Sequence, residues 1–191
     1  SKEYIINKFG NYSCTIVSDS RPAGSSQKAT LSDYFTKFQG KSTLTLDFDP
    51  SNSIFLLRGI KYPNFFFSKK EIKGLFFYHS IKDAGTLPHI HRDAFNILRK
   101  GQKKWAMYDA HKSYSPMGYK LLDETYQKYP IGTHSKEWFE KDLKQNAKKV
   151  KLYVCNQLDT DIVYIPFHYS HAVLNVSDEV LGLVVQNERK I

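Results

Sequence analysis

Cysteine is scarce in this chain, and so are long runs of apolar residues. Cys14 and Cys155 are the only two cysteines among 191 residues, and their separation argues against a disulfide framework or a CxxC zinc site. No apolar run approaches the roughly 18 residues that a membrane-spanning helix needs, and no signal peptide is visible. These absences predict a soluble, intracellular protein, nuclear or cytoplasmic, without a membrane partner.

The composition predicts one strand-rich domain. Hydrophobic residues make up 41% and aromatic residues 15% of the chain, enough to bury a core and line a ligand pocket. We expect residues 1–191 to form a single domain. In it, residues 1–49 flank a barrel core at 50–191, and the core carries an insertion at 109–149.

Short segments rich in β-branched and aromatic residues recur along the chain and predict strands. They lie near residue 12 and at 53–58, 74–80, 96–99, 104–108, 150–154, 161–165, 171–175 and 181–187. Their number and length predict a mainly-β, jelly-roll-like barrel. Apolar residues at helical spacing predict flanking helices at 30–38 and 135–146, the second with Ser135 as its N-cap. The Tyr-, Pro- and Gly-rich stretch 109–134 is a candidate substrate lid.

Positive charge predominates. The chain has 28 Lys and Arg against 19 Asp and Glu, a net charge of +9. This charge favours acidic partners such as a nucleic acid, an acidic protein or a small dianion. The lysine-rich segment 141–151 is more typical of a solvated helix face than of a nucleic-acid groove.

The segment Thr86-Leu-Pro-His-Ile-His-Arg-Asp93 is the most specific pattern in the sequence. In an extended strand, His89, His91 and Asp93 would face the same side. His171, roughly eighty residues later, is the natural distant partner of a facial triad, which leaves coordination positions open for a substrate and dioxygen. Two registers are open: His89 with His91, which we favour, or His91 with Asp93.

Three blocks carry a resemblance to the JmjC-domain group of Fe(II)/2-oxoglutarate oxygenases, and within it to the Jumonji-domain protein 6-like branch. Gly85-Thr-Leu-Pro-His-Ile-His91 resembles the family's Thr-x-x-His-x-Asp ligand motif. The segment 95–105 is similar to its Trp-Asn-x-x-x-x-Gly-x-Lys-Arg-Trp block, and 161–175 to its Pro-x-x-x-x-His-x-Val-Leu-Asn block. The resemblance covers about residues 50–190 and implies a double-stranded β-helix of the cupin type.

The resemblance also implies roles for individual residues. His89 and His171 would be iron ligands, Lys103 and Thr86 would bind the distal carboxylate of 2-oxoglutarate, and further cosubstrate contacts would come from Asn96, Asn187 and Phe55. The loop residues His168 and Tyr169, just before the third ligand, are candidates for the substrate mouth. By the same resemblance, the chain would hydroxylate or demethylate a side group of a protein, with RNA as the second substrate class.

One position departs from the family pattern, because His91 occupies the place of the carboxylate ligand. Three neutral imidazoles leave an Fe(II) site at +2, whereas a carboxylate lowers that charge by one unit. Three arrangements follow: His91 ligates the metal directly, Asp93 reaches the metal instead, or the site has lost its redox chemistry and retains only binding. Two other function classes therefore stand beside the oxygenase, a three-histidine cupin metalloenzyme that does not use 2-oxoglutarate and a non-catalytic binding module.

Overall fold

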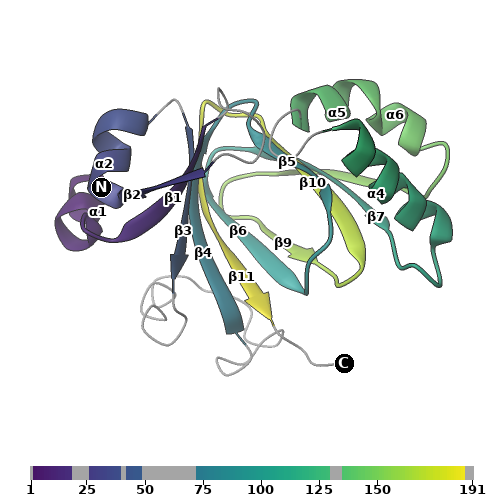
Figure 1. Ribbon diagram of the computed structural model, residues 1–191, viewed down its shortest axis with the longest axis horizontal. Coiled ribbons are helices and arrows are strands. Elements are labelled where there is room, and N and C mark those ends of the chain that lie inside the picture. The colour runs from purple at the N-terminus through teal and green to yellow at the C-terminus, as the bar shows by residue number, and fades with distance from the viewer. Residues whose placement is uncertain (1, 19–25, 40–41, 49–71, 130–134, 188–191) are drawn as a thin grey trace.

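Strands dominate the computed structural model, which describes residues 2–18, 26–39, 42–48, 72–129 and 135–187. The helices lie at the two ends of the molecule and flank a body of strands (Figure 1). None of the described helices is long and apolar enough to cross a membrane.

Two antiparallel sheets form the body of the molecule. The larger sheet has the order β2-β1-β3-β4-β11-β6-β9, and its strands are β1 (Ser13–Ser18), β2 (Ser26–Thr30), β3 (Ser42–Phe48), β4 (Ile72–Ile81), β6 (Ala94–Lys100), β9 (Ile162–Ile165) and β11 (Glu179–Asn187). The smaller sheet has the order β5-β10-β7-β8, and its strands are β5 (Gly85–His89), β7 (Lys103–Asp109), β8 (Tyr153–Gln157) and β10 (Tyr169–Asn175). From β4 to β11 the chain passes repeatedly between the sheets, which confirms the predicted mainly-β, double-stranded β-helix.

Each sheet is covered on its outer side by helices (Figure 1). The N-terminal α1 (Lys2–Phe9), α2 (Leu31–Asp33) and the π-helical turn η1 (Tyr34–Phe38) pack near the larger sheet, where Phe9, Leu31 and Phe35 share a buried cluster with Leu75 and Val185. Beside the smaller sheet lie α4 (Pro116–Lys128), α5 (Ser135–Lys141) and α6 (Leu143–Asn146).

A separate apolar cluster fills part of the space between the sheets. It joins Ala94 and Ile165 of the larger sheet to Trp105 and Val173 of the smaller one. Because this cluster and the outer ones fix both faces of the smaller sheet, the strands that carry the histidines are held between packed layers.

Several predicted elements differ in detail. The helix predicted at 30–38 begins at Leu31, where Thr30 Oγ1 accepts a hydrogen bond from the Asp33 amide at 3.0 Å, but after one turn it widens into η1. The helix predicted at 135–146 is interrupted at Asp142, whose carboxylate accepts hydrogen bonds from Lys128 Nζ and Tyr129 Oη and so ties this break to the end of α4.

The predicted lid is largely helical, and one predicted strand lies further along the chain than expected. Residues 116–128 of the predicted lid form α4, which buries Leu121 and Leu122. No described residue of 109–134 lines the cavity between the sheets, and a role of this segment as a substrate lid stays a prediction. The strand predicted at 150–154 lies instead at 153–157, in register with β7, and the strand predicted at 53–58 lies outside the described residues.

Candidate metal centre

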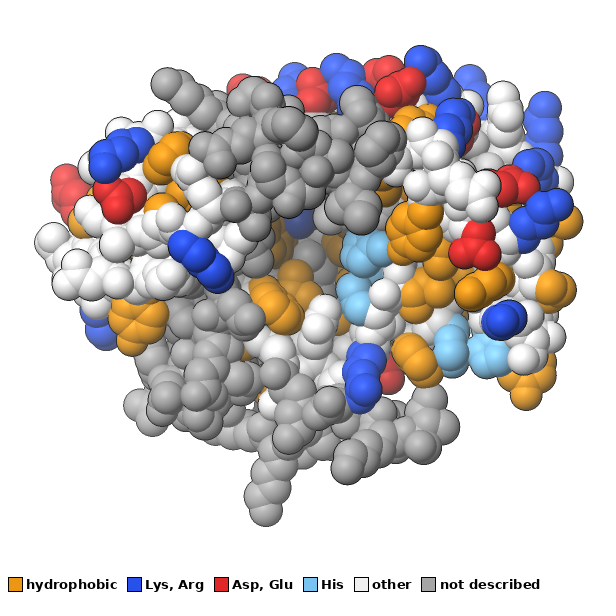
Figure 2. Space-filling view, in the orientation of Figure 1, with side chains coloured by type: hydrophobic (Ala, Val, Ile, Leu, Met, Phe, Trp, Pro, Cys, Tyr) orange, Lys and Arg blue, Asp and Glu red, His pale blue; other side chains and the backbone are white. Residues whose placement is uncertain are grey.

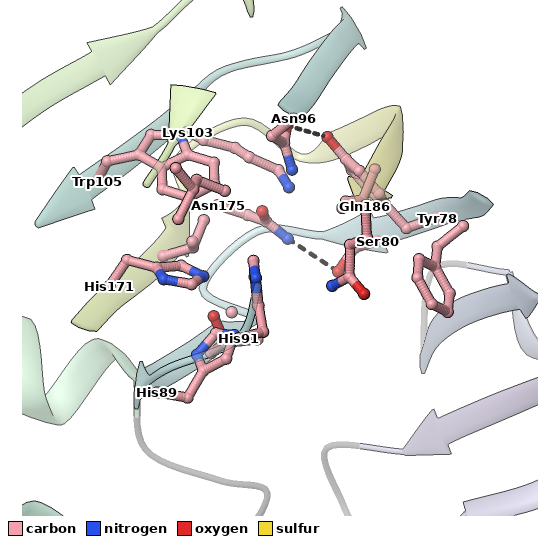
Figure 3. Close-up of a pocket in the computed structure, with 16 residues that line it drawn as sticks. Tyr78, Ser80, His89, His91, Asn96, Lys103, Trp105, His171, Asn175 and Gln186 are labelled. Atoms are coloured by element: carbon pink, nitrogen blue, oxygen red, sulfur yellow. Dashed lines mark hydrogen bonds between the residues drawn. The ribbon is translucent and has the colours of Figure 1, made fainter. Parts of the chain in front are cut away.

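Three histidines converge from two strands of the smaller sheet. His89 ends β5, His91 lies just beyond it, and His171 lies on β10 directly opposite His89 in the antiparallel register. Their ligand atoms all lie within 4.8 Å of one another, and the rings point toward a common centre (Figure 3). The strand period of two brings His89 and His91 to one side, and the pairing of β5 with β10 adds the third imidazole.

The backbone fixes which nitrogen each histidine offers. Nδ1 of His89 lies 2.8 Å from the Leu87 carbonyl oxygen, Nδ1 of His91 lies 2.6 Å from that of Arg92, and Nδ1 of His171 lies 3.2 Å from that of Tyr169. A carbonyl oxygen can only accept, so we assign the proton of each neutral ring to Nδ1. Nε2 then keeps its lone pair, which is the arrangement of metal-ligating histidines.

Burial keeps these imidazoles neutral. Desolvation lowers the pKa of His89 to about 4 and also lowers the pKa of His91. The pKa of His171 falls well below its usual value, first because of burial and second because of the neighbouring His89. At neutral pH the cluster therefore offers three uncharged nitrogen donors, a set that suits Fe, Co, Ni, Cu or Zn better than Mg or Ca.

The histidines stand at a cavity of about 280 Å³ between the two sheets. Histidine side chains are visible on the wall of a hollow in the space-filling view (Figure 2). The cavity has an apolar wall of Phe76, Trp105, Ile165, Val173 and Val184, and its polar lining beyond the histidines comprises Tyr78, Ser80, Thr86, Asn96, Lys103, Asn175 and Gln186. Most of the surface that these residues expose to the cavity is apolar, and polar groups converge on it from several strands, which is typical of a small-molecule site.

Among the described residues that line this cavity, Lys103 is the only lysine or arginine. Its side chain is buried, and its Nζ lies 3.6 Å from the centroid of the Tyr78 ring. Within the described part of the chain the amine has no hydrogen bond or ion pair, and desolvation lowers its pKa to about 7. A buried amine without an anion is unfavourable by itself, so the cavity is built to receive negative charge.

Buried amides brace the opposite wall. Tyr78 donates its hydroxyl hydrogen to Asn96 Oδ1 at 2.8 Å. Asn175 Nδ2 donates to Ser80 Oγ at 2.8 Å and to the Ile81 carbonyl at 3.0 Å (Figure 3). These hydrogen bonds tie the polar wall to β4, and they hold its side chains in fixed orientations.

Trp105 positions the third histidine. Its ring stacks on His171 with a centroid distance of 5.9 Å and an interplanar angle of 29°. The indole Nε1 donates to Gln157 Oε1 at 2.8 Å, and Gln157 Nε2 donates to the Asn96 carbonyl at 2.9 Å. The ring therefore cannot rotate away from His171 without breaking a buried chain of hydrogen bonds.

The structure brings together most of the predicted site residues. His89, His91, His171, Lys103 and two further residues, Thr86 and Asn96, all line one cavity. Asp93, the alternative ligand, is not part of the histidine group; its Oδ1 accepts hydrogen bonds from Tyr164 Oη and the Phe167 amide, both at 2.8 Å. The geometry therefore favours the register of His89 with His91.

Other predicted residues lie elsewhere. Asn187 is buried but does not line the cavity, because β11 directs its neighbour Gln186 there instead. His168 packs against His111 at a centroid distance of 4.2 Å, and Tyr169 begins β10 opposite Asp109; neither lines the cavity. Phe55 lies outside the described residues.

Sequence patterns did not identify four polar residues of the cavity lining, Tyr78, Ser80, Asn175 and Gln186. Tyr78 and Ser80 lie on a predicted strand, and their period of two was the one available signal. Asn175 stood inside a block used for the resemblance and Gln186 inside the strand predicted at 181–187, but only the pairing of the strands shows that they face the cavity.

No protein-family model matches the chain, and no curated protein matches it. Among solved structures it is similar to YcfD of Escherichia coli: one structure aligns with a TM-score of 0.56 and 14% identity over 94% of this chain. The complex of YcfD, described as a ribosomal oxygenase, with cobalt and 2-oxoglutarate aligns with a TM-score of 0.56 and 13% identity over 100% of the chain. The complex with cobalt and succinic acid aligns with a TM-score of 0.53 and 15% identity over 95%. The chain spans about two fifths of the length of these proteins (42%, 43% and 41%), and at this identity the likeness shows the fold.

Proposed function

We propose that this chain is an oxygenase domain of the JmjC type that uses Fe(II) and 2-oxoglutarate. The observation that carries the proposal is the pairing, in one small cavity, of three converging Nε2 donors with a buried amine that has no anion among the described residues. A bound metal alone explains the three converging histidines, but it does not explain the buried amine of Lys103. A dianion that chelates the metal at one end and meets Lys103 at the other explains both features.

The donor set fits a divalent metal. His89, His91 and His171 would hold the ion through Nε2, while the Leu87, Arg92 and Tyr169 carbonyls keep each ring in the required tautomer. With iron and 2-oxoglutarate bound, the cofactors supply the oxidising chemistry through reaction with dioxygen. The protein contributes rigid ligands and a mostly apolar wall that limits access of water.

Lys103 would bind the carboxylate at the far end of the cosubstrate, with Thr86 and Asn96 beside it. Because burial holds the pKa of this amine near 7, an incoming anion should raise it and favour uptake of a proton. The charges are then partly offset: the carboxylate that chelates the +2 ion leaves the metal complex with its neutral histidines at +1, and the distal carboxylate meets the Lys103 charge. The replacement of the family's carboxylate by His91 leaves the metal complex without an anionic protein ligand.

The substrate class follows from the likeness rather than from the site. The similar structures are described as ribosomal oxygenases, and this chain carries a net charge of +9. We therefore propose hydroxylation or demethylation of a protein side chain, with a ribosomal component as the first candidate and RNA as the second. Assignment to the Jumonji-domain protein 6-like branch, the single-domain organisation and an intracellular location stay predictions.

The direct test is calorimetric titration of 2-oxoglutarate into the cobalt-loaded protein. A charge-assisted hydrogen bond contributes about 1.5–3 kcal/mol, so Lys103→Met should weaken binding roughly 10- to 150-fold. Lys104→Met is the matched control, because Lys104 is the next residue on β7 and does not line the cavity. Equal affinity in wild type and Lys103→Met would contradict the proposal.

One observation favours a second candidate, a three-histidine cupin metalloenzyme that does not use 2-oxoglutarate. The described metal group contains no carboxylate, as in sites built from imidazoles alone. This candidate predicts tight cobalt binding with no measurable binding of 2-oxoglutarate, whereas a non-catalytic module predicts weak binding of both.

A further inference from the structure

Strand β8 forms an edge of the smaller sheet and is unusually exposed. It pairs with β7 on one side, and no other described strand pairs with it. Val154 is 49% exposed, Tyr153 is 46% exposed and Leu158, just past the strand, is 49% exposed; the thiol-bearing Cys155 is also exposed. An apolar edge strand without a charged residue is a template for pairing with another strand.

The hydrogen-bond pattern shows which backbone groups face outward. The Asn175 amide donates to the Ala84 carbonyl, and the Asn175 carbonyl accepts from the Asp83 amide, so both groups of Asn175 point away from β7. Opposite residues of antiparallel strands form hydrogen-bonded and non-hydrogen-bonded pairs in alternation. Asn175 and Lys103 are a non-hydrogen-bonded pair, so the backbone groups of Lys103 point to β8. On β8 it is then Gln157, Cys155 and Tyr153 that bond to β7. The amide and carbonyl groups of Val154 and Asn156 face outward.

The sequence around β8 is self-complementary in charge. Lys149 and Lys151 precede the strand, and Asp159 and Asp161 follow it. If a second copy lies antiparallel with Cys155 opposite Cys155, then Val154 faces Asn156, and Lys151 lies at the same end of the paired strands as Asp159 of the second copy. The ladder ends before Leu158, whose amide donates to Asp161 Oδ2 at 2.8 Å and whose carbonyl accepts from the Asp161 amide at 3.0 Å. The outward groups of Val154 and Asn156 are the ones this pairing uses, so backbone and charge favour the same register.

We propose that β8 is a self-association edge, through which two copies of this chain pair antiparallel about a two-fold axis at Cys155. The two smaller sheets then form one continuous eight-stranded sheet. The contact is a short strand edge and belongs to the weak class of interface. The inference does not rest on the proposed enzymatic function, because none of these residues lines the metal cavity.

Charge reversal tests the pairing and its register. In sedimentation equilibrium under reducing conditions, the wild-type mass should rise with concentration from 22.2 kDa toward twice that value. Lys151→Glu and Asp159→Lys should each remain monomeric because like charges then meet at both ends, and the double variant should dimerise again. A wild type that stays monomeric, or single variants that dimerise as wild type does, would overturn the proposal.

Cross-linking tests the two-fold axis. Residues opposite each other in a non-hydrogen-bonded antiparallel pair have Cα atoms about 4.5 Å apart, within the range for a disulfide. Diamide, which takes up two electrons and two protons from the two thiols, should therefore link wild-type copies through Cys155, since Cys14 is buried. Cys155→Ser should not link.

A variant that keeps the Cys155 thiol but cannot pair through β8 distinguishes cross-linking within the dimer from cross-linking in random collisions. Val154→Pro removes an outward-facing amide without removing a hydrogen bond to β7, at the kind of position where edge strands tolerate proline. It should abolish the cross-link, while Val154→Thr should retain it. Circular dichroism and retained cobalt binding show that Val154→Pro is folded. A folded Val154→Pro protein that links as efficiently as wild type would overturn the proposal.

Discussion

The proton positions on three imidazoles decide what this site can bind. Each Nδ1 faces a backbone carbonyl, and each Nε2 is left to the cavity. Burial then keeps the rings neutral at a pH where exposed histidines begin to take up protons. The consequence is a site that is ready for metal at neutral pH.

Protonation of these rings should make the apo-protein less stable in acid. His89 has a folded pKa of about 4 against about 6.5 in the unfolded chain. Between these values the unfolded state binds more protons, so the free energy of unfolding falls as the pH falls through this window, by on the order of 3 kcal/mol for His89. Urea unfolding across the window should show a shallower pH dependence in His89→Asn than in wild type. Identical dependence in both proteins would show that His89 is not buried as a neutral ring.

Lys103 should reduce stability in the absence of an anion. Its folded pKa of about 7 lies below the value of about 10.4 for an unfolded lysine. Below pH 7 the buried charge destabilises the fold in full, and between the two pKa values the free energy of unfolding rises with pH. Lys103→Met should therefore be more stable than wild type by a few kcal/mol at about pH 7, with a smaller difference at about pH 9. Urea unfolding at the two pH values measures these differences, and the control Lys104→Met should match wild type. A Lys103→Met protein less stable than wild type at neutral pH would show that the buried Lys103 amine does not destabilise the fold.

At the residue scale, the sequence predicted the histidines, the lysine and the wall residues Thr86 and Asn96, but not the rest of the cavity wall. Short spacings such as His89 to His91 follow directly from strand geometry. Asn187 and Gln186 are adjacent, and one residue of register decides which of them faces the cavity. That register depends on the pairing of β11 with β4, which a single sequence does not contain.

At the scale of elements, the close contact of β5 with β10 sets the distance between His89 and His171. A Cβ atom on Gly85 would lie 1.9 Å from the Val173 carbonyl oxygen and 2.9 Å from Ser135 Oγ. Only glycine lets the two strands approach to this distance while α5 packs behind them.

Gly85→Ala should therefore separate β5 from β10. We expect a loss of stability of about 2 kcal/mol or more, because the obstructing atom is backbone and cannot move aside. Cobalt affinity, followed by the visible absorption of the bound ion, should fall together with the melting temperature. Gly74→Ala is the control, since its added methyl group meets the end of the movable Phe76 side chain. Unchanged cobalt affinity in Gly85→Ala would mean that this contact does not position the histidines.

Most strands of the barrel could be predicted, and the helices beside the smaller sheet could be predicted only in part. Strands such as β4 and β11 combine apolar character with bounded length, so local pattern suffices. The segment containing α4 begins with proline and is rich in tyrosine, and it was interpreted as a lid; it becomes helical where Leu121 and Leu122 find a buried surface. That surface is tertiary, and local propensity does not reveal it.

At the scale of the whole molecule, a bound metal would link segments roughly eighty residues apart. Saturation at a hundredfold excess over Kd raises the free energy of unfolding by about 2.7 kcal/mol. Cobalt should therefore raise the melting temperature of wild type, and it should not do so for His171→Ala. Asp93→Asn is the matched control: it alters the alternative ligand, and it should retain the cobalt-dependent rise. Loss of the rise in Asp93→Asn but not in a folded His89→Ala would assign the ligands to the other register, His91 with Asp93.

Joint binding of metal and 2-oxoglutarate in one cavity is the central requirement of the proposed oxygenase site. Anaerobic titration of Fe(II) into the apo-protein with 2-oxoglutarate present tests this directly, because bidentate chelation produces a weak visible charge-transfer band. We predict a band in wild type that weakens sharply in Lys103→Ala. Tight Fe(II) binding with no band in wild type would contradict the oxygenase assignment and favour the three-histidine metalloprotein instead.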